Sequence, residues 1–291
     1  MVDYLRINRR LEEIYSRNIF FVVGVPKSGT TWLQSLLDAH VEITCSGEEN
    51  FSKLLSNFEH VVNDYNKAMA ANNQKLGANG HMLFTQENLE HLIVTATGQL
   101  FDNYNGGSDI KCIGSKSPVM IETVRAYAHM IPGAKFIHII RDGRDVCVSA
   151  WIRNLLWNEE GTRKRWPSFE IFVESTGLNW AGYINKARSV KIDFPDRYQE
   201  IHYERLHSDP ESTIKGILEF LGVDASKPMI DLCIETASFE KLSRGRKRGQ
   251  EDNESFYRKG IIGDWKNHFD QNCIEAFMKH GGSMLRELGY L

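Results

Sequence analysis

The strongest constraint on the fold is a buried strand that leads through a short glycine-containing loop into a helix. The stretch Ile19–Val25 is continuously apolar and rich in β-branched residues, which predicts a buried strand. Apolar residues with helical spacing follow within residues 30–40. The loop between them, residues 26–31, therefore directs several backbone N–H groups and the positive end of a helix dipole toward one point, which predicts an anion-binding site.

The glycine spacing of this loop is that of a nucleotide-binding phosphate loop, but its lysine lies elsewhere. Gly24 and Gly29 fit the pattern G-x-x-x-x-G-K-[ST], whereas Thr30 occupies the position where that pattern has lysine. Lys27 lies inside the loop and brings a full positive charge to the bound group, while Gly29 lets the backbone approach closely. Hydroxyl donors are available on Ser28, Thr30 and Thr31. An ordinary strand-to-helix turn with a surface lysine is the alternative interpretation of the loop taken alone.

The rest of the chain alternates short apolar runs with amphipathic stretches. Further strands are predicted at 109–117, 135–142 and 198–206, and further helices at 124–131, 143–154, 210–223 and 271–288. This alternation predicts an α/β fold with a mostly parallel central sheet flanked by helices. We expect a single domain over residues 1–291, with a helical and loop insertion at about 51–108 and a substrate lid at about 152–180.

Charge and cysteine content limit the classes of partner. The net charge of −3 gives no general attraction to nucleic acid or anionic lipid, so an anion site must be built from local basic residues. The five cysteines have no metal-ligand spacing, which predicts reduced thiols, no metal site and a cytoplasmic location. The longest early apolar run, Ile19–Val23, is too short to span a bilayer, so membrane insertion is not expected.

Two further segments carry basic residues that suit a second anion. Arg141 ends the strand predicted at 135–142, and Ser149 follows on the next helix, so both can converge on an anion at the carboxyl edge of the sheet. Arg258 and Lys259 precede the flexible Gly260 far along the chain, and a basic run at 244–248 lies just before them. Each run taken alone is more often a solvated face, but together with the loop they predict a clamp for two anionic groups.

These segments together resemble the sulfotransferases that use 3′-phosphoadenosine 5′-phosphosulfate (PAPS). PKSGTTW at 26–32 resembles the 5′-phosphosulfate loop of that family, and RDGRDVCVSAW at 141–151 resembles its 3′-phosphate segment. RKGIIGDWKNHF at 258–269 resembles the closing signature of the cytosolic branch, so the resemblance covers nearly the whole chain. It implies a P-loop-like sulfotransferase fold and an enzyme that moves a sulfuryl group from PAPS to an acceptor hydroxyl, releasing 3′-phosphoadenosine 5′-phosphate (PAP) without a metal.

The resemblance also implies roles for individual residues. The 5′-phosphosulfate would be held by Lys27, Ser28, Gly29, Thr30 and Thr31, and the 3′-phosphate by Arg141, Ser149, Arg258, Lys259 and Gly260. Trp32 would stack on adenine, with Tyr203, Ser238 and Phe239 completing the nucleotide pocket. For each of these aromatic residues considered alone, a position in the core is the alternative. Lys27 and Lys116 would stabilise the leaving oxygen.

The sequence departs from the cytosolic branch at the catalytic base. In GSKSPVM, residues 114–120, Pro118 stands where that branch has its catalytic histidine. Tyrosylprotein and heparan sulfotransferases use a glutamate shortly after the first helix, and LDAHVEITCSGEENF at 37–51 resembles that context. Glu49 is therefore the expected base, with Glu48 as its immediate rival, and the resemblance gives His40 no proton-transfer role. Capping of the following helix is the alternative role for the two glutamates.

Two other classes of function stay open, and so does the acceptor. A P-loop kinase or NTPase would need lysine after Gly29 and an acidic magnesium ligand at a strand end, and a non-catalytic nucleotide-binding protein would keep the pocket without the base. The expected partner is a hydroxylated small-molecule or carrier-bound acceptor, with a homodimer left open. An apolar alcohol or phenol would suit Trp151, Trp157, Trp166, Phe169 and Phe172, whereas an acidic or carrier-bound acceptor would suit Arg163, Lys164 and Arg165.

Overall fold

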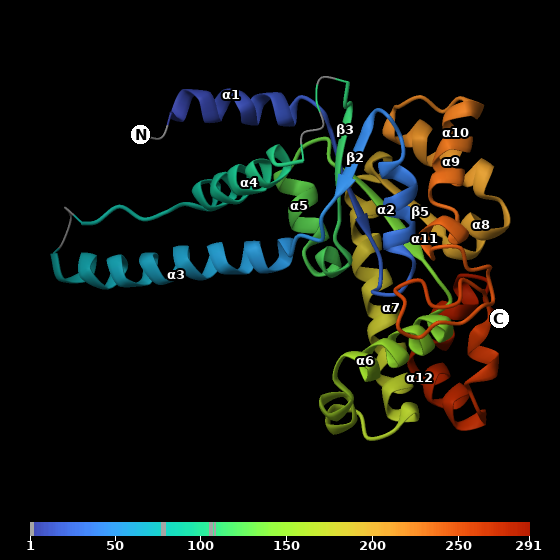
Figure 1. The fold of residues 1–291 in the computed structure, drawn as a ribbon. Coiled ribbons are helices and arrows are strands. Elements are labelled where there is room, and N and C mark those ends of the chain that lie inside the picture. The colour runs from blue at the N-terminus through green and yellow to red at the C-terminus, as the bar shows by residue number, and fades with distance from the viewer. Residues whose placement is uncertain (1–2, 77–79, 105–106, 108) are drawn as a thin grey trace.

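A parallel sheet with helices on both faces forms the centre of the computed structural model, which describes residues 3–76, 80–104, 107 and 109–291 (Figure 1). In this described part, the strand order is β2-β3-β1-β4-β5 and every neighbouring pair is parallel. The strands are β1 (Asn18–Val23), β2 (Ile43–Ser46), β3 (Cys112–Lys116), β4 (Lys135–Ile140) and β5 (Tyr198–His202). The sheet confirms the predicted α/β fold.

Helices cover both faces of the sheet because the side chains of each strand alternate between them. The α-helices are α1 (Tyr4–Tyr15), α2 (Thr30–Asp38), α3 (Phe51–Leu76), α4 (Gln86–Asp102), α5 (Val124–Met130), α6 (Gly143–Arg165), α7 (Phe169–Asp193), α8 (Tyr203–Ser208), α9 (Pro210–Leu221), α10 (Lys227–Thr236), α11 (Phe239–Leu242) and α12 (Gln271–Glu287). The 3₁₀ helices are η1 (Pro118–Glu122), η2 (Pro195–Arg197) and η3 (Asp264–Asn267).

The central strand β1 shows how the core is divided. Phe21 and Val23 pack into a cluster with side chains of α3, α4, α5 and α7. Phe20 and Val22 point to the opposite face and pack with α2, α9 and α10. A third cluster joins α6, α7 and α12 beyond the sheet. The continuous apolar run in the sequence is thus explained by a strand that is buried on both faces.

Helices α3 and α4 lie side by side and project from the sheet as an arm (Figure 1). The buried residues of α3, Phe51, Leu55 and Val62, all belong to its first half, so the base of the arm is anchored in the core while its far half extends outward. These two helices contain most of the insertion predicted at about 51–108. Residues 77–79, 105, 106 and 108 of that range lie outside the described residues.

The strand predicted at 198–206 is too long. Its pairing with β4 ends at the pair Ile140 and His202, and β4 gives way there to a helix N-cap at Asp142. Without a partner strand the chain turns into α8 at Tyr203. Strand β2 and helices α1, α7, α10 and α11 were not predicted as separate elements; β2 has only four residues, which is too short for a clear periodicity.

The parallel arrangement gathers the loops that follow the strands at one edge of the sheet. The loop after β1 contains Lys27, the segment after β2 contains Glu48, and Arg141 directly follows β4. Carboxyl ends of parallel strands are where α/β proteins bind ligands. This edge is therefore where a functional site is expected.

No helix within the described residues combines the length and apolar character needed to cross a bilayer.

Candidate functional site

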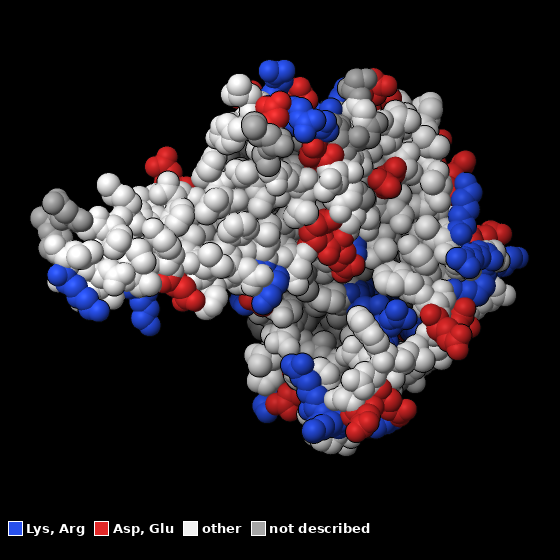
Figure 2. Space-filling view, turned by 60° about the vertical axis from the view of Figure 1, so that its left-hand side comes forward, with Lys and Arg blue, Asp and Glu red and all other residues white. Residues whose placement is uncertain are grey.

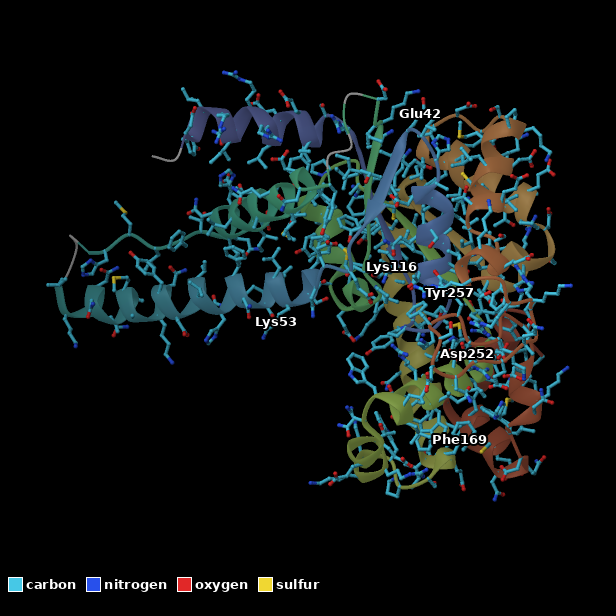
Figure 3. The ribbon with its side chains drawn as sticks, viewed as in Figure 1. Glu42, Lys53, Lys116, Phe169, Asp252 and Tyr257 are labelled. Atoms are coloured by element: carbon cyan, nitrogen blue, oxygen red, sulfur yellow. The ribbon has the colours of Figure 1, made fainter. Side chains whose placement is uncertain are left out.

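A cavity of about 500 Å³ opens at the carboxyl edge of the sheet and brings together most of the predicted site residues. The predicted residues that line it are Lys27, Gly29, Thr30, Thr31, Trp32, Arg141, Ser149, Tyr203, Phe239, Arg258, Lys259 and Gly260. Lys116 reaches it through a contact with Glu48, which lines the cavity. Figure 3 shows Lys116 at the sheet and Tyr257, another lining residue, on the segment between α11 and α12.

The loop after β1 has the geometry of an anion-binding turn. Gly29 is the N-cap of α2 with a φ of 99°, and Lys27 also has a positive φ of 78°. A Cβ atom on Gly29 would lie 2.6 Å from the Tyr203 ring, so only glycine fits between the loop and that ring. The Ser28 hydroxyl is buried with no hydrogen-bond partner among the described residues. A buried donor of this kind requires a partner, which a bound oxyanion would supply.

Arg141 lies beneath the loop and connects it to the C-terminal segment. Its guanidinium donates to the carbonyl oxygen of Lys27 at 3.3 Å and to that of Ile261 at 3.2 Å. It also stacks on Tyr203, 4.5 Å from the ring centroid. The Arg141 Nε atom is buried with no partner among the described residues, so the guanidinium keeps one donor for a ligand.

Positive charge is concentrated at the cavity around the buried Lys27. Burial, together with the like charges of Arg153 and Arg141, lowers the pKa of Lys27 to about 8. The Lys27 ammonium lies 4.8 Å from the centroid of the Phe256 ring. A bound anion would relieve the repulsion among these cations, so the arrangement favours an anionic ligand.

Arg258 and Lys259 are held at the cavity by acidic partners. Asp264, whose side chain is 2% exposed, contacts Arg258 and accepts from Lys259 at 2.8 Å. Burial opposes ionisation of Asp264, but the hydrogen bonds from Lys259 and Arg258 outweigh it and hold the pKa of this carboxyl well below its ordinary range. Glu251 also contacts both cations. Arg258 and Lys259 are therefore held at the cavity by carboxylates of the protein itself.

Asp145, on the first turn of α6, fixes the same segment to the sheet. Its carboxylate accepts from the backbone N–H groups of Gly263 at 2.8 Å and Trp265 at 2.9 Å. The sequence segment that begins at Arg141 thus supplies both a cavity cation and the anchor for the clamp. Nothing in the local sequence around Asp145 indicated this second role.

Aromatic side chains form one wall of the cavity. Trp32 donates its indole N–H to the carbonyl oxygen of Ala237 at 3.0 Å and packs edge-on against Tyr203 and His207. Phe239 lies against Gly260, where a Cβ atom would be only 2.5 Å from its ring. Trp32, Tyr203 and Phe239 all line the cavity, as predicted for a pocket around a planar base. Ser238 instead acts as the N-cap of α11, accepting from the Lys241 N–H at 3.4 Å.

The structure distinguishes the two adjacent glutamates. Both carboxylate oxygens of Glu49 accept hydrogen bonds, one from the Tyr104 hydroxyl and one from the Ser115 hydroxyl. Glu49 is not among the residues that line the cavity. The bond to Glu49 raises the pKa of Tyr104 to about 12. Glu48 lines the cavity and contacts Lys116, whose side chain is almost fully buried. His40 is bound to backbone groups of Asp224 and Glu42, consistent with a structural role.

Several cavity residues were not assigned roles from the sequence. His207 donates from Nε2 to the Gly260 carbonyl oxygen at 3.0 Å and thereby ties α8 to the clamp, and burial lowers its pKa to about 4. Arg248, which belongs to the basic run at 244–248 that was predicted to take part in the clamp, lies over Trp32, 5.5 Å from the ring. Arg153 follows Ser149 by one helical turn, a spacing that could have indicated it. The others are Asn154, Leu242, Phe256, Tyr257 and Ile261.

Most of the aromatic residues expected in a lid at about 152–180 pack on one another instead of lining the cavity. Trp151 contacts Phe169 and Phe172, and Trp166 contacts Phe172 edge-on. Trp157 is the exception: it lines the cavity and is 83% exposed. Figure 2 shows the surface hollowed below the root of the helical arm, with basic side chains beside the hollow.

The fold and site define a class of protein: a parallel α/β domain with a strand–loop–helix turn suited to anions and a separate group of basic side chains at the carboxyl edge of its sheet. The chain belongs to the sulfotransferase family, because the family model for the sulfotransferase domain matches residues 17–289.

Individual relatives agree with this membership. The chain is 27% identical to a flavonol sulfotransferase-like protein of Flaveria bidentis over 278 residues, which is 89% of this chain and 79% of the relative. It is 31% identical to sulfotransferase 2A1 of Mus musculus over 160 residues, 50% of this chain and 54% of that protein. The fold resembles mouse sulfotransferase SULT7A1 complexed with PAP, with a TM-score of 0.54 and 18% identity over 96% of this chain and 94% of that one. It also resembles retinol dehydratase in complex with androsterone and PAP, with a TM-score of 0.51 and 20% identity over 97% of this chain and 86% of that one.

Proposed function

We propose that this protein transfers the sulfuryl group of PAPS to a hydroxyl of a small-molecule or carrier-bound acceptor, with Lys27 and Lys116 stabilising the leaving oxygen and a glutamate as base. The observation that carries the proposal is one cavity that holds the loop of Lys27, the clamp of Arg258 and Lys259, and a glutamate in contact with a lysine. A family relative crystallised with PAP supports the choice of nucleotide.

The residues of the cavity fit a nucleotide that carries two separate anionic groups. The free hydroxyl of Ser28 and the free Nε of Arg141 are buried donors that need an acceptor. Lys27, Gly29 and the N-terminus of α2 suit a 5′-phosphosulfate, and Arg258 with Lys259 suits a 3′-phosphate. When bound, PAPS supplies the sulfuryl group and a phosphate leaving group.

We propose Glu48 as the general base in preference to Glu49. The cavity-lining position of Glu48 supports this choice, and so does the fact that both carboxylate oxygens of Glu49 already accept protein hydroxyls. The Lys116 contact puts an ammonium beside Glu48. One group can then accept the hydroxyl proton of the acceptor while the other stabilises negative charge on oxygen, which is the arrangement that in-line transfer requires.

The proposed function is tested by nucleotide binding and then by transfer. PAP should bind much more tightly than AMP or ATP and without magnesium, because only PAP engages both the loop and the clamp. Calorimetry with the three nucleotides, with and without magnesium, measures this. Radiolabelled PAPS offered with a panel of phenols and alcohols, followed by mass spectrometry, then tests transfer. Equal affinity for AMP and PAP would contradict the proposal.

A second expected result concerns the pH dependence of PAP binding. The free protein loses the Lys27 proton as the pH rises through about 8, whereas a bound phosphate favours the protonated lysine and raises its pKa. Affinity for PAP should therefore fall above about pH 8, by up to about tenfold per pH unit. Calorimetry from about pH 7 to about pH 9.5 measures this, and Lys27→Met should bind more weakly and flatten the profile in that range. An equally steep profile in Lys27→Met would assign the titration to another group.

A phosphoryl-transferring enzyme is less well supported. Such enzymes bind magnesium with the help of acidic side chains. Here Thr30 stands where a phosphate loop has its lysine, and Arg141 follows β4 where an acidic magnesium ligand would be needed. The five cysteines are free and buried, which fits a reducing compartment, and on that basis we propose a cytoplasmic location. A homodimer stays a prediction.

A further inference from the structure

The two ends of the cavity are lined by segments that follow strands on opposite sides of β1 in the strand order. Tyr203 follows β5, which lies on one side of β1, and Trp32 with Phe239 completes the aromatic wall at that end. Glu48 follows β2 and Pro118 follows β3, both on the other side of β1. If the nucleotide occupies the aromatic end, as in the proposed function, the acceptor must approach Lys27 from the end of Glu48 and Pro118.

One face of α6 lines the cavity and leads away from Ser149 along the helix. Ser149, Arg153 and Trp157 are spaced by four residues, so they lie on one face of the helix, and all three line the cavity. The helical geometry is interrupted directly afterwards at Asn158, with φ of −156° and ψ of 84°. This face of α6 therefore begins with Ser149, which is proposed to bind the nucleotide. It ends with the exposed indole of Trp157, and Arg153 lies between them.

The charged group of Arg153, like that of Lys27, has no hydrogen-bond or ion-pair partner among the described residues, whereas other cations at the cavity do. Lys116 contacts Glu48, Arg258 contacts Asp264, and Arg141 donates to backbone carbonyls. Arg153 is only partly exposed, yet its guanidinium has no hydrogen bond or ion pair with any of the residues that the structure describes. Arg153 lines the same cavity as Lys27, and its positive charge contributes to the lowered pKa of Lys27. The Arg153 guanidinium is therefore available to pair with an anionic group of a ligand in the cavity.

We propose that the acceptor carries a carboxylate in addition to the hydroxyl that receives the sulfuryl group, and that Arg153 binds this carboxylate. The inference rests on the proposed function and deepens it by naming the acceptor class. Trp157 and Phe256, 83% and 52% exposed, line the cavity with Arg153 and present apolar surface. The acceptor is therefore a hydroxy acid with an apolar or aromatic body between its two oxygen groups.

The experiment compares acceptors that differ only in the carboxylate, using the full chain saturated with PAP. Calorimetry measures the binding of 6-hydroxy-2-naphthoate against 2-naphthol, and of 8-hydroxyoctanoate against 1-octanol, to wild type and variants. At least one acid should bind the wild type about 10- to 100-fold more tightly than its neutral partner, as expected for a charge-assisted pair. Arg153→Met should abolish that preference, Arg153→Lys should retain part of it, and both should bind PAP like the wild type.

Lys164→Met is the matched control, because Lys164 lies on the same helix, is exposed and does not line the cavity. It should keep the wild-type preference for the acid. A wild type that prefers neither acid over its neutral partner overturns the proposal, as does a preference that survives in Arg153→Met. If Arg153→Met weakens PAP binding tenfold, Arg153 belongs to the nucleotide site and the proposal is also overturned. Failure of the proposed function would appear separately, as failure of the wild type to bind PAP.

Discussion

Glu48→Gln should lose about 10²- to 10⁴-fold in kcat while binding PAP normally, because the change removes the carboxylate proposed to accept the acceptor's proton. The substitution is nearly isosteric, and Glu48 is mostly exposed, with 63% of its side chain accessible. The change also removes the carboxylate that contacts the almost fully buried ammonium of Lys116, so some loss of fold stability is expected, which thermal denaturation measures separately from the rate. The measurement is the single-turnover rate with radiolabelled PAPS, together with the dissociation constant of PAP.

Glu49→Gln is the matched control at the adjacent position. Its carboxylate accepts hydrogen bonds from Tyr104 and Ser115, so its loss should cost stability, about 1–3 kcal/mol, and leave the transfer rate largely unchanged. Thermal denaturation and the same single-turnover assay separate the two effects. If Glu49→Gln lost the transfer rate at full occupancy of PAP and Glu48→Gln retained it, the base would be Glu49.

Arg258→Ala should weaken PAP binding about 10- to 150-fold, since a lost charge-assisted contact to phosphate costs about 1.5–3 kcal/mol. AMP has no 3′-phosphate, so its affinity should change little. The ratio of AMP to PAP dissociation constants should therefore fall in the variant, and calorimetry with both nucleotides measures it. Lys266→Ala, an exposed residue outside the cavity, should leave the ratio unchanged. A variant that weakened AMP and PAP equally would show that Arg258 supports the fold of the segment and does not contact the 3′-phosphate.

Much of the fold followed from local patterns. Strands β1 and β4 and helices α2, α9 and α12 lie close to their predicted ranges, because the strands are short apolar runs and the helices have apolar residues at helical spacing. Strand β2 was missed because its four residues pair only with β3, and that pairing is not recorded in the local pattern. The end of β5 was misjudged for the same reason, since apolar residues continue past His202 but the neighbouring strand does not.

The sequence by itself determined the chemistry of the loop and the charges of the clamp, because Lys27, Gly29 and Arg258 belong to contiguous motifs in which order and spacing carry the information. Only the tertiary structure separated Glu48 from Glu49, since adjacent side chains point in different directions and the distinction depends on Tyr104 and Ser115, which are distant in sequence. Tertiary packing likewise decided that Arg153 has no hydrogen-bond or ion-pair partner among the residues that the structure describes. A side chain's partners are set by segments that meet only when the chain folds, and no local pattern contains them.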